Sequence, residues 1–173
     1  MYNELFKFRE ERGLQVSPGN ITANITAENA ELQIELSNNN VFGMICEFAD
    51  HVIYAINAME SYGHDAKTNI ESISNYDSEL LDDPSPERAV SCILIALAGY
   101  NLERDIKALA LIARIALNAI DTLGFHAERC VLEKAKCINS RKGAHNAQAG
   151  KWQKDPNQCP GTLYKPDYLA CKK

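Results

Sequence analysis

Between residues 41 and 62, apolar side chains recur at steps of three and four residues, the spacing of an α-helix. These positions form one stripe, widened by apolar neighbours, and a helix this apolar is expected inside a bundle. Gly63 follows the pattern directly and predicts the end of the helix. The stripe contains Val41, Ile45, Phe48, Val52, Ile56 and Met59, with Phe42, Ala49, Ile53 and Ala55 beside them.

The same reading predicts helices on both sides of this one. A preceding helix is expected from about Thr26 to Leu36, with Thr26 as its N-cap candidate and a turn over residues 17–20 before it. An acidic linker over residues 76–85 ends in an N-cap serine followed by proline, which predicts a helix start. Three later helices are expected at about Pro86–Ala98, Leu102–Leu123 and Ala127–Arg141. The second of these is also mostly apolar, with a stripe formed by Ile106, Leu109, Ala113, Leu117 and Ile120.

A short internal repeat links two of these helices. Ala55–Gly63 matches Ala116–Gly124 without a gap, 61 positions later. The repeat predicts a duplicated helical hairpin, with copies at about 20–74 and 85–141. We therefore predict an all-α fold: a bundle of about five helices over residues 1–142 and an irregular, extended tail over 143–173. The tail has no helical period, and we expect its aromatic residues to pack on the bundle or on a partner subunit.

Composition narrows the function classes. The chain of 173 residues has 18 basic and 23 acidic side chains, a net charge of −5, which disfavours a general nucleic-acid-binding surface. No apolar run approaches the roughly 18 residues of a membrane span, and the charged start is unlike a signal peptide. We expect a cytoplasmic protein, and its six cysteines include no CxxC pair that would suggest a zinc knuckle.

Two pairs of acids carry the candidate chemistry. Glu28 and Glu31 lie three residues apart on one predicted helix, and Glu47 and Asp50 lie three residues apart on the next. Residues at this spacing share one helix face, so a hairpin would bring the four carboxylates together. Crowded carboxylates need a cation, and hard divalent ions such as Mg²⁺ prefer oxygen ligands.

A plainer interpretation of the same pattern stays open. The second helix carries one polar stripe, which could simply be its face toward water. The stripe contains Glu47, Asp50, Tyr54, Asn57 and Ser61. A matching acidic stripe on the preceding helix, formed by Glu28, Glu31 and Glu35, favours a shared site instead.

The arrangement of these motifs resembles a known enzyme family. Glu28-Asn29-Ala30-Glu31-Leu32 and Glu47-Phe48-Ala49-Asp50 are similar to the acid motifs of the MazG-like, all-α nucleoside triphosphate pyrophosphohydrolases, which include the dimeric dUTPases. Residues 133–141 look like the Lys…Asn…Arg signature of that family, and residues 150–168 look like the end of phage-encoded members.

The resemblance implies an enzyme that hydrolyses (d)NTPs to nucleoside monophosphate and pyrophosphate. Mg²⁺, or Mn²⁺ in its place, would be held by Glu28, Glu31, Glu47 and Asp50, with Glu31 and Glu47 as catalytic residues. Either Glu31 or Glu35 would take the proton of the attacking water.

The resemblance also implies residues that bind the substrate. Lys136 and Arg141 would contact phosphate oxygens, and Asn139 or Asn57 would contact sugar or base. A homodimer or homotetramer is expected, located in the host cytoplasm if the chain is phage-encoded.

Two departures from the family pattern keep rival functions open. Residues 75–123 look like an inserted or duplicated hairpin, and the basic signature follows this second copy, which lacks the acids. A catalytically silent protein that binds nucleotide or a partner is one alternative. A structural bundle whose acids face water is another.

Overall fold

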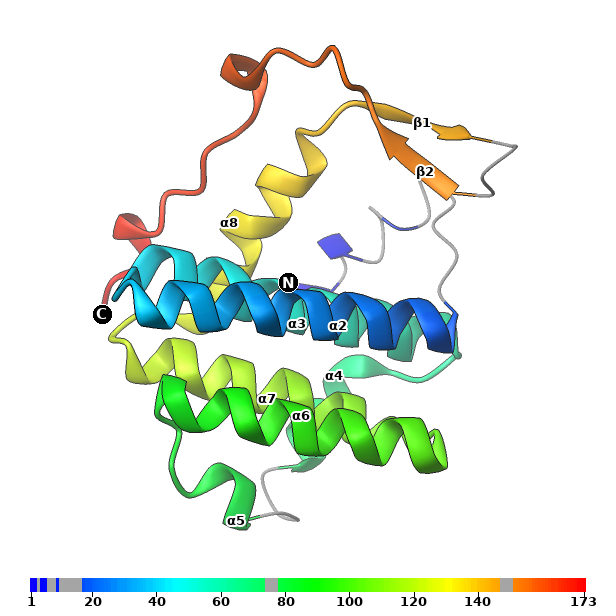
Figure 1. Ribbon diagram of the computed structural model, residues 1–173, viewed down its shortest axis with the longest axis vertical. Helices are drawn as coiled ribbons and strands as arrows, with labels where there is room; N and C mark the ends of the chain where they lie inside the picture. Colours follow the sequence, from blue (N-terminus) through cyan, green and yellow to red (C-terminus); the bar gives the residue numbers. More distant parts are fainter. Residues whose placement is uncertain (3, 6–8, 10–16, 74–77, 147–150) are drawn as a thin grey trace.

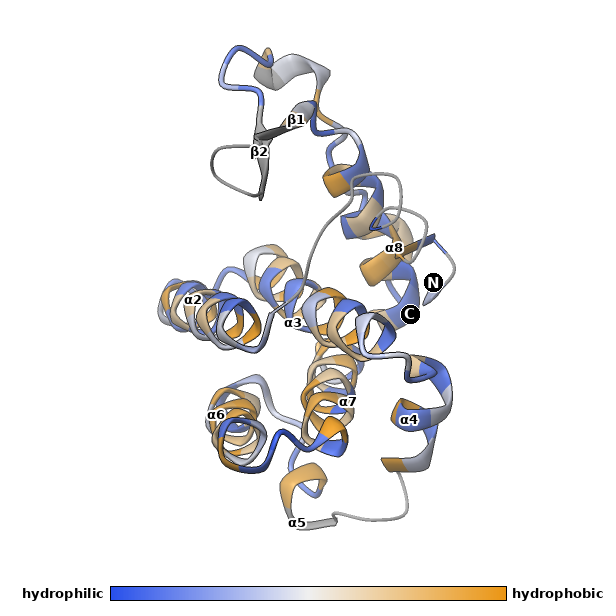
Figure 2. Ribbon diagram, turned by 90° about the vertical axis from the view of Figure 1, so that its right-hand side faces the viewer, coloured by the Kyte–Doolittle hydropathy of each residue, from blue (hydrophilic) through white to orange (hydrophobic). Residues whose placement is uncertain are grey.

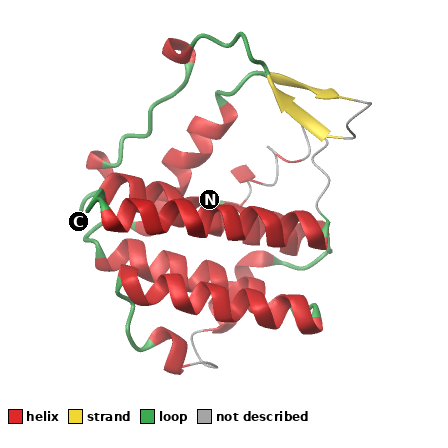
Figure 3. Ribbon diagram, in the orientation of Figure 1, coloured by secondary structure: helices red, strands yellow, loops and turns green. Residues whose placement is uncertain are grey.

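The computed structural model describes residues 1–2, 4–5, 9, 17–73, 78–146 and 151–173. Helices dominate these residues (Figure 3), so the all-α prediction is confirmed. In chain order the helices and strands are α2 (Pro18–Ser37), α3 (Val41–Ser61), α4 (Ala66–Ile73), α5 (Ser78–Leu81), α6 (Pro86–Glu103), α7 (Ile106–Thr122), α8 (Ala127–Asn139), β1 (Gly143–Asn146) and β2 (Lys151–Lys154), followed by the 3-10 turns η1 (Pro160–Thr162) and η2 (Leu169–Cys171).

Two helical hairpins stack to form the bundle. The α2–α3 hairpin lies on the α6–α7 hairpin, with α2 and α6 in front of α3 and α7 (Figure 1), and the view along the axes places the four helices at the corners of a square (Figure 2). The predicted apolar stripes of α3 and α7 are buried at the centre, apart from their first turns. Val41 and Phe42 at the start of α3 remain 37% and 44% exposed.

The first long helix begins earlier than the sequence suggested. The Ser17 side chain accepts a hydrogen bond from the backbone N–H of Asn20 at 3.2 Å, and Pro18 occupies the first helical position. The predicted turn over residues 17–20 is therefore wrong, and Thr26 lies in mid-helix rather than at the N-cap. The Asn- and Thr-rich first turns have weak helix propensity, but Ile21 and Ile25 are buried against the bundle.

Two further boundaries differ from prediction. Helix α6 continues to Glu103 and α7 starts only at Ile106, because Arg104 adopts a left-handed conformation (φ 55°) and Asp105 caps the backbone N–H of Lys107. Helix α4 was not predicted at all. Asp65 supplies its cap by accepting from the N–H of Thr68 at 2.7 Å. Residues 76–77 of the predicted linker lie outside the described residues.

Helices α3 and α7 are both followed by a glycine in the left-handed conformation. Gly63 and Gly124 both adopt positive φ, 78° and 89°, a conformation that side-chain-bearing residues rarely take. The 61-residue offset therefore relates equivalent positions at these ends. Upstream it fails, since it would match Val41, the first residue of α3, to Leu102 within α6. The duplication stays a prediction.

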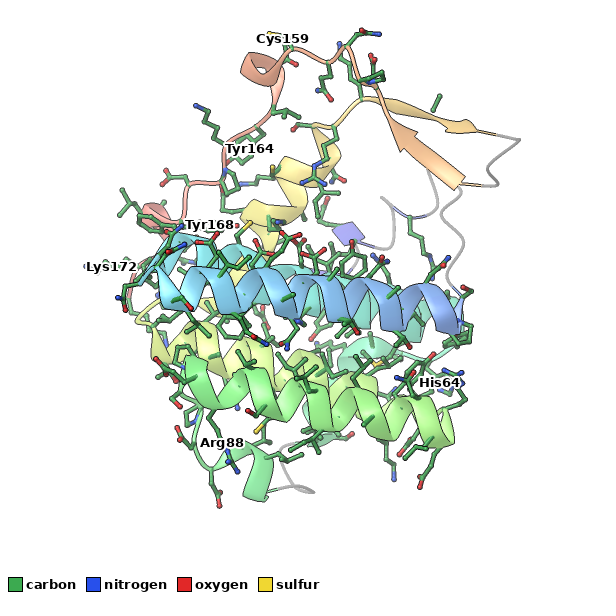
Figure 4. The ribbon with its side chains drawn as sticks, in the orientation of Figure 1. His64, Arg88, Cys159, Tyr164, Tyr168 and Lys172 are labelled. Atoms are coloured by element: carbon green, nitrogen blue, oxygen red, sulfur yellow. The ribbon has the colours of Figure 1, made fainter. Side chains whose placement is uncertain are left out.

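Helix α8 leaves the bundle and the tail returns beside it (Figure 1). After an antiparallel β1–β2 hairpin, the tail descends past Tyr164 to Tyr168 (Figure 4), whose ring stacks on Phe42 at 6.4 Å. The backbone N–H of Lys173 donates to the carbonyl of Gly124 at 2.9 Å. The C-terminal segment is thus anchored at two places, on Phe42 at the start of α3 and on Gly124 after the end of α7.

Among the described helices, α3 alone has the length and apolar composition of a bilayer span. It is the central helix of the bundle and most of it is buried. Its apolar character is accounted for by packing in the bundle.

Candidate functional site

Three of the four predicted acids converge between α2 and α3. One carboxylate oxygen from each of Glu28, Glu31 and Glu47 lies within 4.8 Å of the others. Antiparallel packing of the two helices explains this, since it puts the middle of α2 beside the middle of α3. Glu31 is exposed, Glu28 is half-buried and Glu47 is buried, so the cluster has one side open to solvent.

The tight turn between the helices fixes their register. Asn40 caps α3 by accepting from the N–H of Gly43 at 3.2 Å, and its side-chain amide donates to Glu35 at 2.6 Å. A side chain at residue 43 would collide with the Glu35 carboxylate. Glu35 therefore serves the turn, and the structure does not bring it into the three-carboxylate cluster.

Glu47 is the most constrained member of the cluster. Its side chain is only 8% exposed, and its Oε2 has no hydrogen-bond donor among the described residues. Burial, followed by the adjoining Glu28 carboxyl, raises the pKa of Glu47 to about 8. Two carboxyl groups in contact must share a proton or hold a cation between them.

Asp50 lies beside Glu47 and forms an ion pair with Lys134. The Lys134 ammonium of α8 is 2.5 Å from Oδ2 of Asp50 and donates to the Cys46 thiol at 2.8 Å. Burial raises the pKa of Asp50 to about 6, although Lys134 acts in the opposite direction. Asp50, Cys46 and Glu47 form a second set of converging ligand atoms, which shares Glu47 with the first.

The first set fits a hard divalent cation. It offers carboxylate oxygens from two helices, and Glu31 leaves one side open for water or substrate. Glu47 adds a buried oxygen that no donor in the described part of the chain satisfies. A cation placed there would remove the cost of crowding anions and bring Glu47 to its charged form. Asp50 extends the same acidic region, with Lys134 already neutralising part of its charge.

Lys136 and Asn139, which were predicted to contact phosphate and sugar or base, do not lie on the face of α8 that carries Lys134. Lys136 pairs with Glu133 at 2.5 Å and lies over the Tyr164 ring, 5.8 Å from its centroid. Asn139 and Lys136 both line a cavity of about 600 Å³ against the N-terminal residues and η2. Two residues along a helix correspond to a rotation of about 200°, which turns Lys136 away from the direction of Lys134. The structure does not bring Lys136 or Asn139 to the acids.

The other predicted contacts lie closer to the acidic region. The charge of Arg141 helps to lower the pKa of Asp50, against the larger effect of burial. Asn57 is half-buried on α3, one turn beyond Tyr54, and its backbone carbonyl accepts from Arg9 at 3.2 Å. Burial and the nearby Glu28 raise the pKa of Tyr54, so its hydroxyl stays neutral.

The cation that sequence reasoning missed is Lys134. Its side chain is 6% exposed, which is rare for lysine without a charged partner. The sequence offers one signal only: Lys134 follows Cys130 and Val131 of α8, both buried, at helical spacing, whereas Lys136 does not. That pattern assigns Lys134 to the inner face.

His51 supports the site from inside the bundle. It is fully buried, and its Nδ1 donates to the Glu47 carbonyl at 2.7 Å, which fixes the proton on Nδ1. Burial lowers the pKa of His51, so the ring is neutral. Its role is to pack between the helices and to hold the turn of α3 that carries Glu47.

No protein-family model, curated protein or solved structure matches this chain. The family resemblance of the acid motifs therefore stays a prediction.

Proposed function

We propose that this protein is a magnesium-dependent nucleotide pyrophosphohydrolase, which cleaves (d)NTPs to nucleoside monophosphate and pyrophosphate. Two observations on Glu47 carry the proposal. It is buried with an Oε2 that has no donor among the described residues, and one of its carboxylate oxygens lies within 4.8 Å of carboxylate oxygens from Glu28 and Glu31. Burying a charged carboxylate beside other carboxylates costs free energy, and a bound divalent cation is the simplest group that removes this cost.

Glu28, Glu31 and Glu47 would hold the metal, with Asp50 at the margin of the same acidic region. When bound, Mg²⁺ would neutralise substrate phosphates and lower the pKa of a water molecule. Glu31, the exposed member of the cluster, would accept a proton from water at the open side. Glu35 is the weaker candidate for this step because it is hydrogen-bonded to Asn40.

Basic groups on α8 would complete the charge balance. Lys134 holds Asp50 in position and keeps a positive charge beside the carboxylates. Arg141 lies near enough to influence the pKa of Asp50 and carries the planar fork suited to phosphate oxygens. Asn57 lies on the same stripe of α3, where it would contact sugar or base.

A catalytically silent protein is the second candidate, and one observation favours it. Asp50 already has an internal cation in Lys134, so part of the acidic region is satisfied without metal. In that case the chain would bind nucleotide or a protein partner without turnover.

A screen in which the reaction products are identified distinguishes the enzyme from the catalytically silent protein. The protein is incubated with common and modified (d)NTPs and Mg²⁺, and nucleoside monophosphate and pyrophosphate are quantified by chromatography. The enzyme releases both in equal amounts, and release stops in EDTA. Binding without release, measured by calorimetry with a non-hydrolysable analogue, would support the silent protein instead.

A further inference from the structure

Two cysteine thiols lie against each other where the C-terminal tail meets α8. Cys130 lies near the start of α8, and Cys171 lies in η2, 41 positions later in the sequence. The two thiols share a hydrogen bond, in which Cys130 is the donor and the Cys171 sulfur is the acceptor. Both side chains are buried, and both are free thiols in the structure.

Backbone hydrogen bonds fix this contact. The N–H of His126 donates to the Cys171 carbonyl at 2.8 Å, and the N–H of Cys130 donates to the His126 carbonyl at 3.1 Å. His126 therefore joins the backbones of both cysteines. Phe125 and Lys172 form an antiparallel bridge next to it. The contact between the two sulfur atoms thus follows from how the tail is attached to α8.

We propose that Cys130 and Cys171 form a reversible disulfide bond when the protein meets a peroxide, and that this bond ties the C-terminal tail covalently to α8. Sulfur atoms already in contact need only small side-chain rotations to reach the bond length of about 2 Å. The surroundings of two other cysteines differ. Cys46 accepts a hydrogen bond from Lys134 at 2.8 Å, and Cys159 is exposed.

Cys171 is the cysteine that an oxidant reaches first. It lines the cavity of about 600 Å³ beside α8, whereas Cys130 is fully buried. Burial raises the pKa of the Cys171 thiol, but the hydrogen bond from Cys130 and the positive charge of Arg129 limit that rise. Burial, followed by the adjoining Cys171, raises the pKa of Cys130 to about 12. Cys130 therefore keeps its proton until Cys171 has reacted.

Hydrogen peroxide balances the reaction. The Cys171 thiolate attacks one peroxide oxygen, the O–O bond breaks, and a sulfenic acid and a water molecule form. The Cys130 sulfur then attacks the Cys171 sulfur, the S–O bond breaks, and the hydroxyl leaves as water with the Cys130 proton. The two thiols together lose two protons and two electrons, and one peroxide becomes two water molecules. A dithiol reductant reverses the bond by thiol–disulfide exchange.

The bond would connect the oxidation state of the tail to the helix beside the candidate site. It closes a loop of chain that contains Lys134, whose ammonium pairs with Asp50. In a reducing compartment, disulfide bonds are usually transient and act in catalysis or redox sensing, which fits a reversible bond. Neither nucleotide nor metal takes part in its formation, so the proposal stands or falls separately from the proposed hydrolysis.

Peptide mass spectrometry of the folded full chain after treatment with hydrogen peroxide tests the proposal. We expect a cross-linked peptide pair that contains Cys130 and Cys171 and disappears in dithiothreitol. Cys130→Ser and Cys171→Ser should each abolish it. Cys159→Ser is the matched control, since Cys159 is exposed and lies at the far end of the tail (Figure 4), and it should leave the cross-link intact.

Two solution measurements report whether the bond tethers the tail. Oxidation should raise the melting temperature by at least about 5 °C, because the cross-link restricts the unfolded chain. It should also slow hydrogen exchange of the His126 amide at least ~10-fold, because that N–H donates to the Cys171 carbonyl. Circular dichroism checks that each variant remains folded.

Three outcomes would overturn the proposal: no cross-link in the folded wild-type protein, a cross-link through other cysteines, or a cross-link that forms only in urea. A bond between Cys130 and Cys171 that leaves the exchange of His126 unchanged would overturn the tethering of the tail.

Discussion

Lys134 of α8 places its ammonium nitrogen 2.5 Å from a carboxylate oxygen of Asp50 on α3. This ion pair joins a helix outside the four-helix bundle to the centre of the acidic region. It also distinguishes Asp50, which has a cation, from Glu47, whose Oε2 has no donor in the described part of the chain. Asp50 therefore has an internal cation, whereas in the proposed function Glu47 would take an external one.

Replacing Glu47 separates function from folding. Glu47→Gln should lower turnover at least ~100-fold, because it removes a charged metal ligand. The melting temperature of the metal-free protein should stay level or rise, because anion crowding is relieved. Steady-state kinetics and thermal unfolding in EDTA measure the two effects. Glu35→Gln is the control for the loss of a metal ligand and should leave metal binding intact, since Glu35 is bound to Asn40 rather than to the cluster. A large loss of stability with normal turnover would make Glu47 a scaffold residue.

Lys134→Ala should destabilise the protein by about 3 kcal/mol at pH 8, because it leaves Asp50 buried without its cation. The loss should shrink at pH 5, where Asp50 can accept a proton. Urea unfolding at both pH values measures this. Lys136→Ala provides the comparison: the Lys136 side chain is 58% exposed, and Glu133 keeps its hydrogen bonds from Tyr164 and Asp167, so the loss should stay below about 1 kcal/mol. Equal losses for the two lysines would contradict the assignment of Lys134 to the site.

The raised pKa of Glu47 predicts an unusual pH dependence without metal. The native protein holds the Glu47 proton up to about pH 8, whereas the unfolded chain releases it near 4.5. Stability should therefore fall by roughly 2–4 kcal/mol as the pH rises from 4.5 to 8, with Asp50 contributing between its ordinary value of 3.8 and about 6. Denaturant titrations in EDTA across this range test the sign. Glu47→Gln should flatten the curve, and an unchanged slope in that variant would refute the shared-proton account.

Tyr168 offers a test of how the tail is held. Its ring stacks on Phe42, but its buried hydroxyl has no partner in the described region by hydrogen-bond geometry. Tyr168→Ala should cost about 3 kcal/mol through lost packing, whereas Tyr168→Phe should be neutral or stabilising. Comparable losses in calorimetric unfolding of the two variants would show that the hydroxyl is bonded after all.

The bundle could be predicted because its two central helices carry long apolar stripes. Val52 and Ile56 of α3, and Leu109 and Ile120 of α7, are buried as their spacing indicated. Helix boundaries set by a single capping residue were harder to predict, since α6 ends at Arg104, which is neither glycine nor proline. Local propensity could not show these features because tertiary packing and cap hydrogen bonds decide them.

The site was predictable in part for the same reason. Helical spacing placed Glu28, Glu31 and Glu47 on facing surfaces, and their convergence follows from the hairpin. Pairing across the bundle was hard to predict, because charged residues occur all along α8 and only the spacing of Cys130 and Val131 indicates which face is inward. The sequence therefore favours Lys136, whereas the structure places Lys134 beside Asp50 and pairs Lys136 with Glu133.

Calorimetric titration of Mn²⁺ into the metal-free protein tests the central claim most directly, with no dependence on substrate. The account predicts a binding site that releases protons, weakened at least ~10-fold by Glu47→Gln or Glu28→Gln and unchanged by Glu35→Gln. Absence of binding at millimolar Mn²⁺, or equal affinity in the wild-type and Glu47→Gln proteins, would contradict it.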